Sequence, residues 1–163
     1  FPGSSIGNFD PDDARGFLER VGGVLGQGGR LLIGVDLIKD PAVLNAAYND
    51  EQGVTADFNL NLLRRINREL DADFDLASFR HHAFFNQDEN RVEMHLISAR
   101  DQRVRVSGET FEVCADEAIH TESSYKYSVE GFQGLAADAG YGVEQVWTDQ
   151  REMFSVHCLR YAG

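Results

Sequence analysis

The chain has 163 residues, of which 42% are hydrophobic and 26% charged, and its formal net charge is −12 at pH 7. This length suits one domain, or one large part of a domain. The negative charge argues against a nucleic-acid partner, because contacts to phosphates need clustered Lys and Arg. No apolar run approaches the roughly 18 residues that span a bilayer, and the first residues lack the pattern of a signal peptide, so we expect no membrane partner.

The cysteines and histidines carry little functional signal. Cys114 and Cys158 form no CxxC motif and lie in apolar, strand-like segments, which predicts buried thiols in a reducing compartment. We therefore expect a cytoplasmic protein. The five histidines show neither HxxxH nor HExxH spacing, so no metal site is predicted.

The chain begins with a tight loop, FPGSSIGNF (1–9), and continues into a helix over residues 10–25. Asp10 is a candidate N-cap and Pro11 suits the first helical position. The apolar residues of this helix recur at the spacing of a buried face: Ala14, Phe17, Leu18, Val21 and Leu25.

A buried strand is expected over residues 30–36, after the helix stop GQGG (26–29). GQGG follows a helix rather than a strand, so it is no nucleotide-binding loop. A helix between a strand-end loop and a buried strand indicates a βαβ crossover, which implies a strand before Phe1.

Further elements follow from periodicity and turn residues. Helices are expected over residues 41–50, 59–74 and 130–140, and strands over 91–99, 102–108, 109–116, 141–149 and 152–161. Ser107-Gly108 is a predicted hairpin turn. In the helix over 59–74, leucines and Ile66 form the apolar stripe, whereas three arginines form the solvated face.

Two stretches remain open between a structural and a functional interpretation. HTESSYKYS (120–128) is either a polar strand end with a helix cap or part of a binding site. In VEMHL (92–96) the alternation places Glu93 and His95 on one face and Met94 on the other. Taken alone, Met94 is a core residue.

Together these segments resemble the histidine-specific, S-adenosylmethionine-dependent methyltransferase family of ergothioneine biosynthesis. The matching segments, in the family's order, are FPGSSIGNFDP, LLIGVDLIKD, LNAAYND, GVTADFNLNLLRRINRELDADFD, VEMHLIS and HTESSYKYS. The resemblance implies methyl transfer from S-adenosylmethionine to the α-amino nitrogen of L-histidine, repeated three times to give hercynine.

The resemblance also implies an α/β fold. Residues 1–40 and 128–163 would be the back half of a class I, Rossmann-like methyltransferase sheet, which ends in a helix and two strands. Residues 41–127 would be a mixed α+β insertion for substrate recognition. In such sheets the ligand lies beyond the carboxyl ends of the parallel strands.

Site residues carried over from the family are as follows. Asn8 orients the attacking amine, and the backbone of Gly3 lines the same pocket. Tyr48 donates to the substrate carboxylate. Glu122 and Ser124 read the imidazole nitrogens, since a carboxylate and a hydroxyl suit a ring with one donor and one acceptor.

Two apolar walls complete the implied substrate pocket, namely Phe58 and Met94. The family's cofactor-binding front half, with its glycine loop, precedes the segment that FPGSSIGN matches, so the cofactor contacts are unknown. We expect a companion fragment or self-association to complete the sheet. Two other functions remain open: methylation of another amino acid or amine, and a catalytically silent binding or assembly fragment.

Overall fold

The computed structural model describes all 163 residues, and the chain divides into two compact units. Unit 1 comprises Phe1–Asp40, Asn86–Arg91 and Ser123–Gly163, and unit 2 comprises Pro41–Phe85 and Val92–Glu122. The predicted functional domains, 1–40 with 128–163 and 41–127, stay a prediction. The compact units differ from them by placing residues 86–91 and 123–127 in unit 1.

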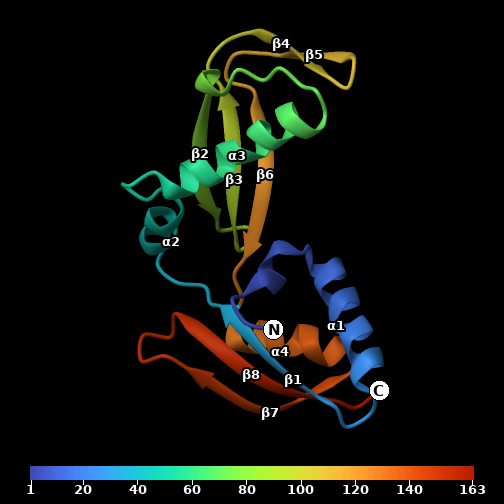
Figure 1. The fold of residues 1–163 in the computed structure, drawn as a ribbon. Helices are drawn as coiled ribbons and strands as arrows, with labels where there is room; N and C mark the ends of the chain where they lie inside the picture. Colours follow the sequence, from blue (N-terminus) through green and yellow to red (C-terminus); the bar gives the residue numbers. More distant parts are fainter. The chain divides into compact units, whose positions relative to one another are not determined.

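Unit 1 is a three-stranded sheet with helices packed on it (Figure 1). Its elements are η1 (Ser5–Asn8), α1 (Pro11–Leu25), β1 (Arg30–Asp36), α4 (Val129–Asp138), β7 (Tyr141–Thr148) and β8 (Phe154–Tyr161). β8 lies between β1 and β7 and pairs antiparallel with both. The expected helix and the two closing strands are confirmed, each within three residues of the predicted bounds.

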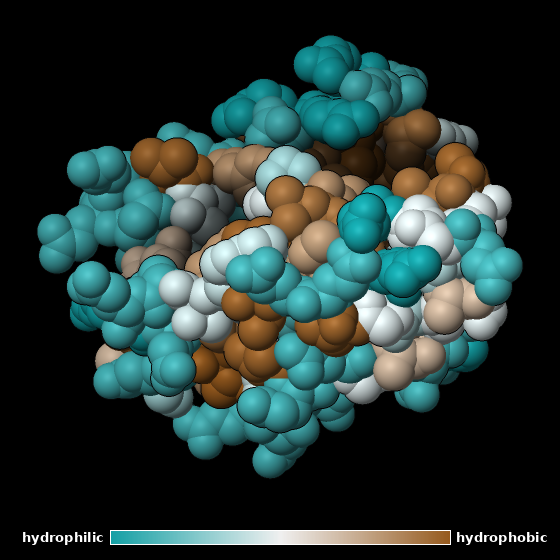
Figure 2. Space-filling model, turned by 90° about the horizontal axis from the view of Figure 1, so that it is seen from below, coloured by the Kyte–Doolittle hydropathy of each residue, from teal (hydrophilic) through white to brown (hydrophobic).

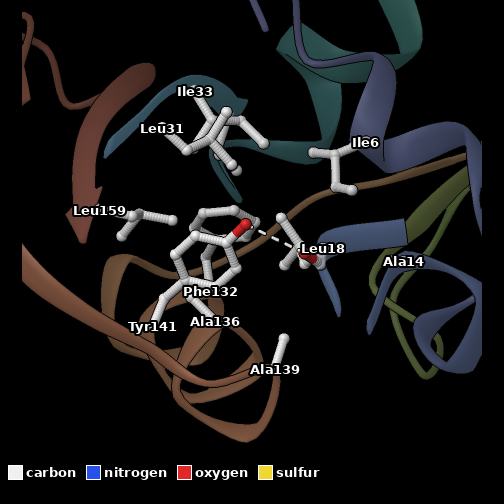
Figure 3. Packing of buried hydrophobic residues seen from close by; sticks show 11 residues of the cluster. Ile6, Ala14, Leu18, Leu31, Ile33, Phe132, Ala136, Ala139, Tyr141 and Leu159 are labelled. Atoms are coloured by element: carbon white, nitrogen blue, oxygen red, sulfur yellow. Dashed lines mark hydrogen bonds between the residues drawn. The ribbon is translucent and has the colours of Figure 1, made fainter. Parts of the chain in front are cut away.

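The core of unit 1 follows from the alternation of β1. Leu31, Ile33 and Val35 are buried on the face that α1 and α4 cover, where Phe132 of α4 is fully buried (Figure 3). The Tyr141 hydroxyl donates to the carbonyl of Leu18 at 3.0 Å, so this buried polar group is satisfied.

The opposite face of the same sheet is apolar and partly open. Leu32 and Trp147 are 57% and 45% exposed. A cavity of about 370 Å³ is lined by residues that include Phe1, Leu32, Phe154 and Val156. Seen from the side of β7 and β8, apolar side chains gather in the middle of the surface, ringed by polar ones (Figure 2).

Phe1 pairs with the edge of β1 as a parallel strand residue would. Its amino group donates to the carbonyl of Leu32 at 2.7 Å, and the amide of Gly34 donates to the carbonyl of Phe1 at 3.1 Å. In a parallel strand pair, one residue forms hydrogen bonds to the residues before and after its partner, and Phe1 does this around Ile33. Phe1 therefore occupies a parallel pairing position at the edge of β1.

Unit 2 combines two helices, a sheet and a hairpin (Figure 1). Its elements are α2 (Pro41–Tyr48), α3 (Val54–Glu69), η2 (Leu76–Ser78), β2 (Phe79–Asn86), β3 (Arg91–Ser98), β4 (Gln102–Val106), β5 (Glu109–Val113) and β6 (Ala118–Tyr125). The last residues of β2 and β6 and the first residue of β3 belong to unit 1. The sheet order is β2-β3-β6. β4 and β5 pair through Ser107-Gly108, both at positive φ, which confirms the predicted turn.

The predicted start of the second helix of unit 2 was wrong. α3 begins at Val54, five residues earlier than expected, because the Asp50 carboxylate accepts from the amides of Val54 and Thr55, both at 2.9 Å. Hydrogen bonds from Thr55 and Val54 lower the pKa of Asp50 to about 2. Because the capping residue, Asp50, lies four residues before the first residue of the helix, the local sequence pattern does not reveal where the helix begins.

Two local predictions were also wrong. Asp10 does not cap α1 with its side chain; its carboxylate accepts from the Tyr125 hydroxyl at 3.0 Å instead. Both cysteines are free thiols, but Cys114 is exposed and Cys158 only partly buried. β5 ends one residue before Cys114, so the thiol lies in a turn and not within the strand.

The buried His157 makes the stability of the protein depend on pH. Its ring is fully buried against Phe132, its Nε2 lies 2.9 Å from the Ser155 hydroxyl, and its Nδ1 has no partner. Burial lowers the pKa of His157. The unfolded state therefore takes up this proton at a higher pH than the folded state, and stability falls as the pH drops below about 6.5.

Replacing His157 by Leu is expected to flatten this dependence. Between pH 7.5 and 5.5, the free energy of unfolding of the unsubstituted protein should fall by up to about 1.4 kcal/mol per pH unit from this group. Urea unfolding followed by circular dichroism measures it. The exposed His82, replaced by Gln, is the control and should leave the slope unchanged. Equal slopes for His157→Leu and the unsubstituted protein would contradict the assignment.

Candidate functional site

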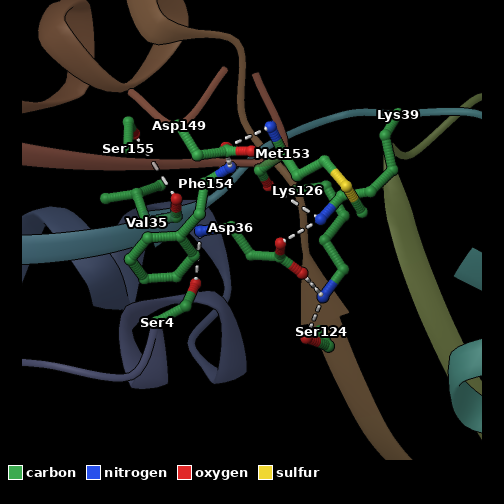
Figure 4. Close-up of polar contacts among 10 residues, drawn as sticks. All are labelled: Ser4, Val35, Asp36, Lys39, Ser124, Lys126, Asp149, Met153, Phe154 and Ser155. Carbon is green, nitrogen blue, oxygen red and sulfur yellow. Dashed lines mark hydrogen bonds and ion pairs between the residues drawn. The ribbon is translucent and has the colours of Figure 1, made fainter. Parts of the chain in front are cut away.

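A buried lysine lies at the carboxyl end of β1. Lys126 is 3% exposed, and its ammonium group lies 2.9 Å from the Asp36 carboxylate (Figure 4). The same ammonium group donates to the hydroxyl of Ser124 at 2.8 Å. Burying a charge is costly unless it is paired and hydrogen-bonded, and Lys126 meets both conditions.

A second ammonium group shares the Asp36 carboxylate. Lys39 pairs with the other carboxylate oxygen and donates to the carbonyl of Met153 at 2.7 Å. The turn that carries Met153 is held by Asp149, which accepts from the amides of Met153 and Phe154 (Figure 4). Two lysines around one carboxylate leave the cluster with one net positive charge.

Backbone pairing fixes this cluster in place. Leu37 and Tyr127 form a parallel bridge, in which the Tyr127 amide donates to Asp36 and the Ile38 amide donates to Tyr127. The Asp36 amide donates to the Ser4 hydroxyl at 2.8 Å. The opening loop, the end of β1 and the end of β6 therefore meet at one place.

Asn8 and Gly3 belong to this place in unit 1. Asn8 is the last residue of η1 and is exposed, whereas Ile6 and Gly7 of the same turn are buried. Gly3 has a φ of +80°, and a Cβ at Gly3 would meet no atom within 4 Å. An open strand end with an exposed amide can hold a polar ligand.

Unit 2 has a separate cavity of about 150 Å³. Phe58 of α3, Met94 of β3 and Glu122 of β6 line it, together with the unpredicted Asn59 and Arg65. Met94 is 2% exposed and Phe58 63% exposed. The cavity thus combines an aromatic ring, a thioether and a carboxylate, which suits a small ligand with an apolar and a basic part.

Tyr48 ends α2 and packs against a cluster of buried apolar residues in unit 2 that includes Leu44 and Met94. The Tyr48 carbonyl lies 2.8 Å from Nε2 of His81, and Nδ1 of His81 lies 3.0 Å from the Asn59 amide. Asn59 is 2% exposed and also donates to the His95 carbonyl at 3.1 Å. These contacts join the end of α2 to α3 and the sheet.

Histidines on the sheet of unit 2 form an aromatic ladder. Glu93, His95 and His120 offer ligand atoms within 4.8 Å of one another. The two imidazole rings are stacked, with centroids 4.7 Å apart and an interplanar angle of 20°, and Phe84 stacks on His95 from the other side. Because imidazole lone pairs lie in the ring plane, stacked rings direct them alongside each other and do not converge on one ion.

The sequence of this chain matches, over residues 1–161, the family described as histidine-specific methyltransferase, SAM-dependent. The chain belongs to this family. It is 45% identical over 151 residues to the histidine N-alpha-methyltransferase of Mycolicibacterium smegmatis, which covers 91% of this chain and 47% of that protein. The chain thus spans about half the length of this relative.

Two further comparisons are more distant. The chain is 36% identical over 158 residues to ergothioneine biosynthesis protein 1 of Neurospora crassa, covering 96% of the chain and 18% of that protein. The crystal structure of an S-adenosylmethionine-dependent methyltransferase from Clostridium acetobutylicum covers 99% of the chain and 56% of its own, with 11% identity and a TM-score of 0.49. Membership of the family, together with the observed α/β architecture, confirms the predicted fold class.

The predicted site residues of this family member fall into two groups. Gly3, Asn8 and Ser124 lie in unit 1, and the other four lie in unit 2: Tyr48, Phe58, Met94 and Glu122. Neither Lys126 nor Asp36 was among the predicted site residues. The only sequence signal for Lys126 is its place at the end of an alternating strand, where a lysine is ordinarily exposed.

The turn that carries Asn8 depends on a glycine. A Cβ at Gly7 would lie 2.6 Å from the carbonyl oxygen of Tyr125. Gly7→Ala should therefore push η1 away from the end of β6 and cost about 1–3 kcal/mol of stability.

Gly134→Ala is the matched control, since a Cβ there meets nothing within 4 Å and the residue lies within α4. That variant should be neutral or gain up to about 1 kcal/mol. Thermal and urea unfolding of both variants measure the difference. Equal stabilities would show that the close approach of Gly7 to Tyr125 does not constrain the turn.

Proposed function

We propose that this protein transfers methyl groups from S-adenosylmethionine to the α-amino nitrogen of L-histidine, giving hercynine in ergothioneine biosynthesis. The family match over residues 1–161 carries this proposal. The small cavity of unit 2 supports it, because its aromatic, thioether and carboxylate groups suit the imidazole side chain of an amino acid.

The residues of this chain have separate tasks in the proposed reaction. The Asn8 amide orients the neutral amine, and Gly3 leaves room for the ligands at the same strand end. When bound, S-adenosylmethionine supplies an electrophilic methyl group on a sulfonium. The protein mainly aligns the amine with this carbon and excludes water, because little further activation is required.

Substrate recognition falls to the remaining residues. Tyr48 donates to the substrate carboxylate, and Phe58 and Met94 form apolar walls. Glu122 accepts from one imidazole nitrogen, and Ser124 pairs with the other. An amino acid without an imidazole would form neither of these two hydrogen bonds, which is how the site selects histidine.

Replacement of Glu122 by Ala tests this assignment. Histidine binding should weaken by about 10- to 100-fold, because a buried imidazole N–H loses its acceptor. Isothermal calorimetry on the full gene product measures this loss. Glu112→Ala is the control, since Glu112 lies on the β4–β5 hairpin and is 73% exposed at its side chain. Unchanged affinity in Glu122→Ala would refute the imidazole assignment.

Methylation of another amino acid or amine is the alternative function within the same family. Turnover of histidine against a panel of other amino acids, in the full gene product, decides between them. Comparable rates for histidine and for an amino acid without a ring nitrogen would favour the alternative. Absence of any methyl transfer would favour a binding or assembly role.

We also propose that the open apolar face of unit 1 is covered by a companion fragment or a second copy of this chain. Leu32, Phe154 and Val156 line a cavity there, and Phe1 occupies a parallel pairing position at the sheet edge. A surface of this kind associates readily in water.

Sedimentation of the 163-residue chain tests this proposal. Self-association should be detectable, and Leu32→Lys should weaken it at least tenfold, because the Leu32 side chain lies on the open face. Val24→Lys, at an 88% exposed position of α1, is the control. A monomer that binds no added amino-terminal half of the relatives would contradict coverage of this face.

No helix of the structure combines the length and the apolar character needed to cross a membrane. We propose the cytoplasm as the working compartment. The two free thiols support this, since one of them is exposed.

A further inference from the structure

We propose that Asn59 is a specificity-determining residue of the cavity in unit 2, and that His81 is the residue that positions it. The Asn59 carboxamide presents its oxygen to the ligand, so the cavity prefers a ring that carries an N–H. This inference rests on the proposed function, since it takes the imidazole of histidine as the group that enters the cavity. Asn59 is not among the site residues that the family resemblance implies.

The orientation of the Asn59 carboxamide follows from a backbone carbonyl. Asn59 is 2% exposed, and its Nδ2 lies 3.1 Å from the carbonyl oxygen of His95. A carbonyl oxygen only accepts hydrogen bonds, so the side-chain atom that faces it is the nitrogen. The same Nδ2 lies 3.0 Å from Nδ1 of His81. Both side-chain hydrogen bonds of Asn59 therefore use the amide nitrogen, and Oδ1 keeps its capacity to accept.

His81 fixes this orientation as one tautomer of the neutral ring. Its Nε2 lies 2.8 Å from the Tyr48 carbonyl, which only accepts, so Nε2 carries the hydrogen. Nδ1 then has a lone pair and accepts from the Asn59 amide. Turning the carboxamide around would set Oδ1 against this lone pair and against the His95 carbonyl, with no hydrogen between them. The nitrogen therefore faces the sheet, and the oxygen faces the cavity that Asn59 lines.

A second asparagine of α3 shows the arrangement of a purely structural carboxamide. Asn67 donates through Nδ2 to the carbonyl of Phe74 and accepts through Oδ1 from the amide of Phe74, both at 2.8 Å. Both ends of that carboxamide are thus satisfied by the backbone. In Asn59, which is more deeply buried, only the nitrogen end is satisfied within the protein. A buried acceptor is costly without a donor, so the oxygen end is suited to a ligand.

The other polar groups of the cavity act in the same sense. The Thr121 hydroxyl donates its hydrogen to the Met94 carbonyl at 2.9 Å, so its oxygen can only accept from a ligand. The carboxylate of Glu122 also accepts. The two remaining polar residues of the lining, Asn61 and Arg65, are exposed. The inner polar lining therefore consists of acceptors.

A lining of acceptors discriminates between rings of similar size. The N–H of an imidazole lies between two acceptors, the Glu122 carboxylate and Oδ1 of Asn59. A thiophene ring has no N–H, so it would cover Oδ1 of Asn59 without providing a donor. Asn59 therefore adds to the preference for a nitrogen ring that Glu122 provides.

Binding of two amino acids to the full gene product tests the inference. Histidine and thienylalanine are similar in size, but only histidine carries a ring N–H. Asn59→Leu removes the acceptor and keeps most of the side-chain volume. The Kd for histidine should rise about tenfold, because one buried hydrogen bond is lost, and the Kd for thienylalanine should stay the same or fall. Calorimetric titration measures the first Kd, and displacement of histidine measures the second.

Asn67→Leu is the matched control on the same helix. It removes the two hydrogen bonds to Phe74, so the free energy of unfolding should fall. The ratio of the two Kd values should stay as in the unsubstituted protein. A purely structural role of Asn59 would give Asn59→Leu this same behaviour, with both ligands weakened equally.

Two variants of His81 test the positioning and leave Asn59 in place. Gln offers one donor and one acceptor, as the neutral imidazole does, so His81→Gln should keep the Kd ratio within about threefold. Leu offers neither, so in His81→Leu the carboxamide is free to turn and the ratio should fall by about fivefold or more.

Equal weakening of both ligands in Asn59→Leu, or equal ratios in the two His81 variants, would overturn the inference and leave the proposed function intact. A full gene product that binds no histidine would instead refute the proposed function, and the inference with it.

Discussion

The ion pair between Asp36 and Lys126 is the constraint on which the strand-end site depends. A buried ammonium group without its partner costs about 3–5 kcal/mol, so the chain can bury Lys126 only where Asp36 meets it. Asp36 ends β1, a strand held by β8 along its length. The pair therefore fixes Lys126, and with it the neighbouring Ser124, relative to the rigid strand β1.

The surrounding contacts converge on the same strand end. Ser4 accepts from the Asp36 amide, and Gly7 lets the η1 turn approach the carbonyl of Tyr125. Phe1 pairs with β1 in parallel at one edge, and Tyr127 pairs in parallel with Leu37 just beyond its end. A ligand site at the carboxyl end of β1 is what the general rule for open α/β sheets predicts.

The sequence predicted the elements whose signals are local. The helix that begins at Pro11, the strand over 30–36 and the turn at Ser107-Gly108 each carry their signal within a few positions: a proline at the first helical position, alternation, and turn residues. No strand was predicted at β2, and the segment of β6 was recognised only as a possible strand end. Polar residues obscure the alternation in both strands, and the fold decides with which strands they pair. The burial of Lys126 was not predictable, since its partner Asp36 lies 90 positions away in the chain.

The separation of Asp36 and Lys126 along the chain also explains why the resemblance identified Ser124 as a candidate contact residue but did not identify Lys126. A motif names Ser124, yet a hydroxyl can donate, accept or do both, and no motif states which. The ammonium group of Lys126 has donors only, so in the hydrogen bond between the two residues Ser124 is the acceptor. The Asp36 carboxylate is shared by Lys126 and Lys39, so a change at Asp36 removes a partner of both lysines at once.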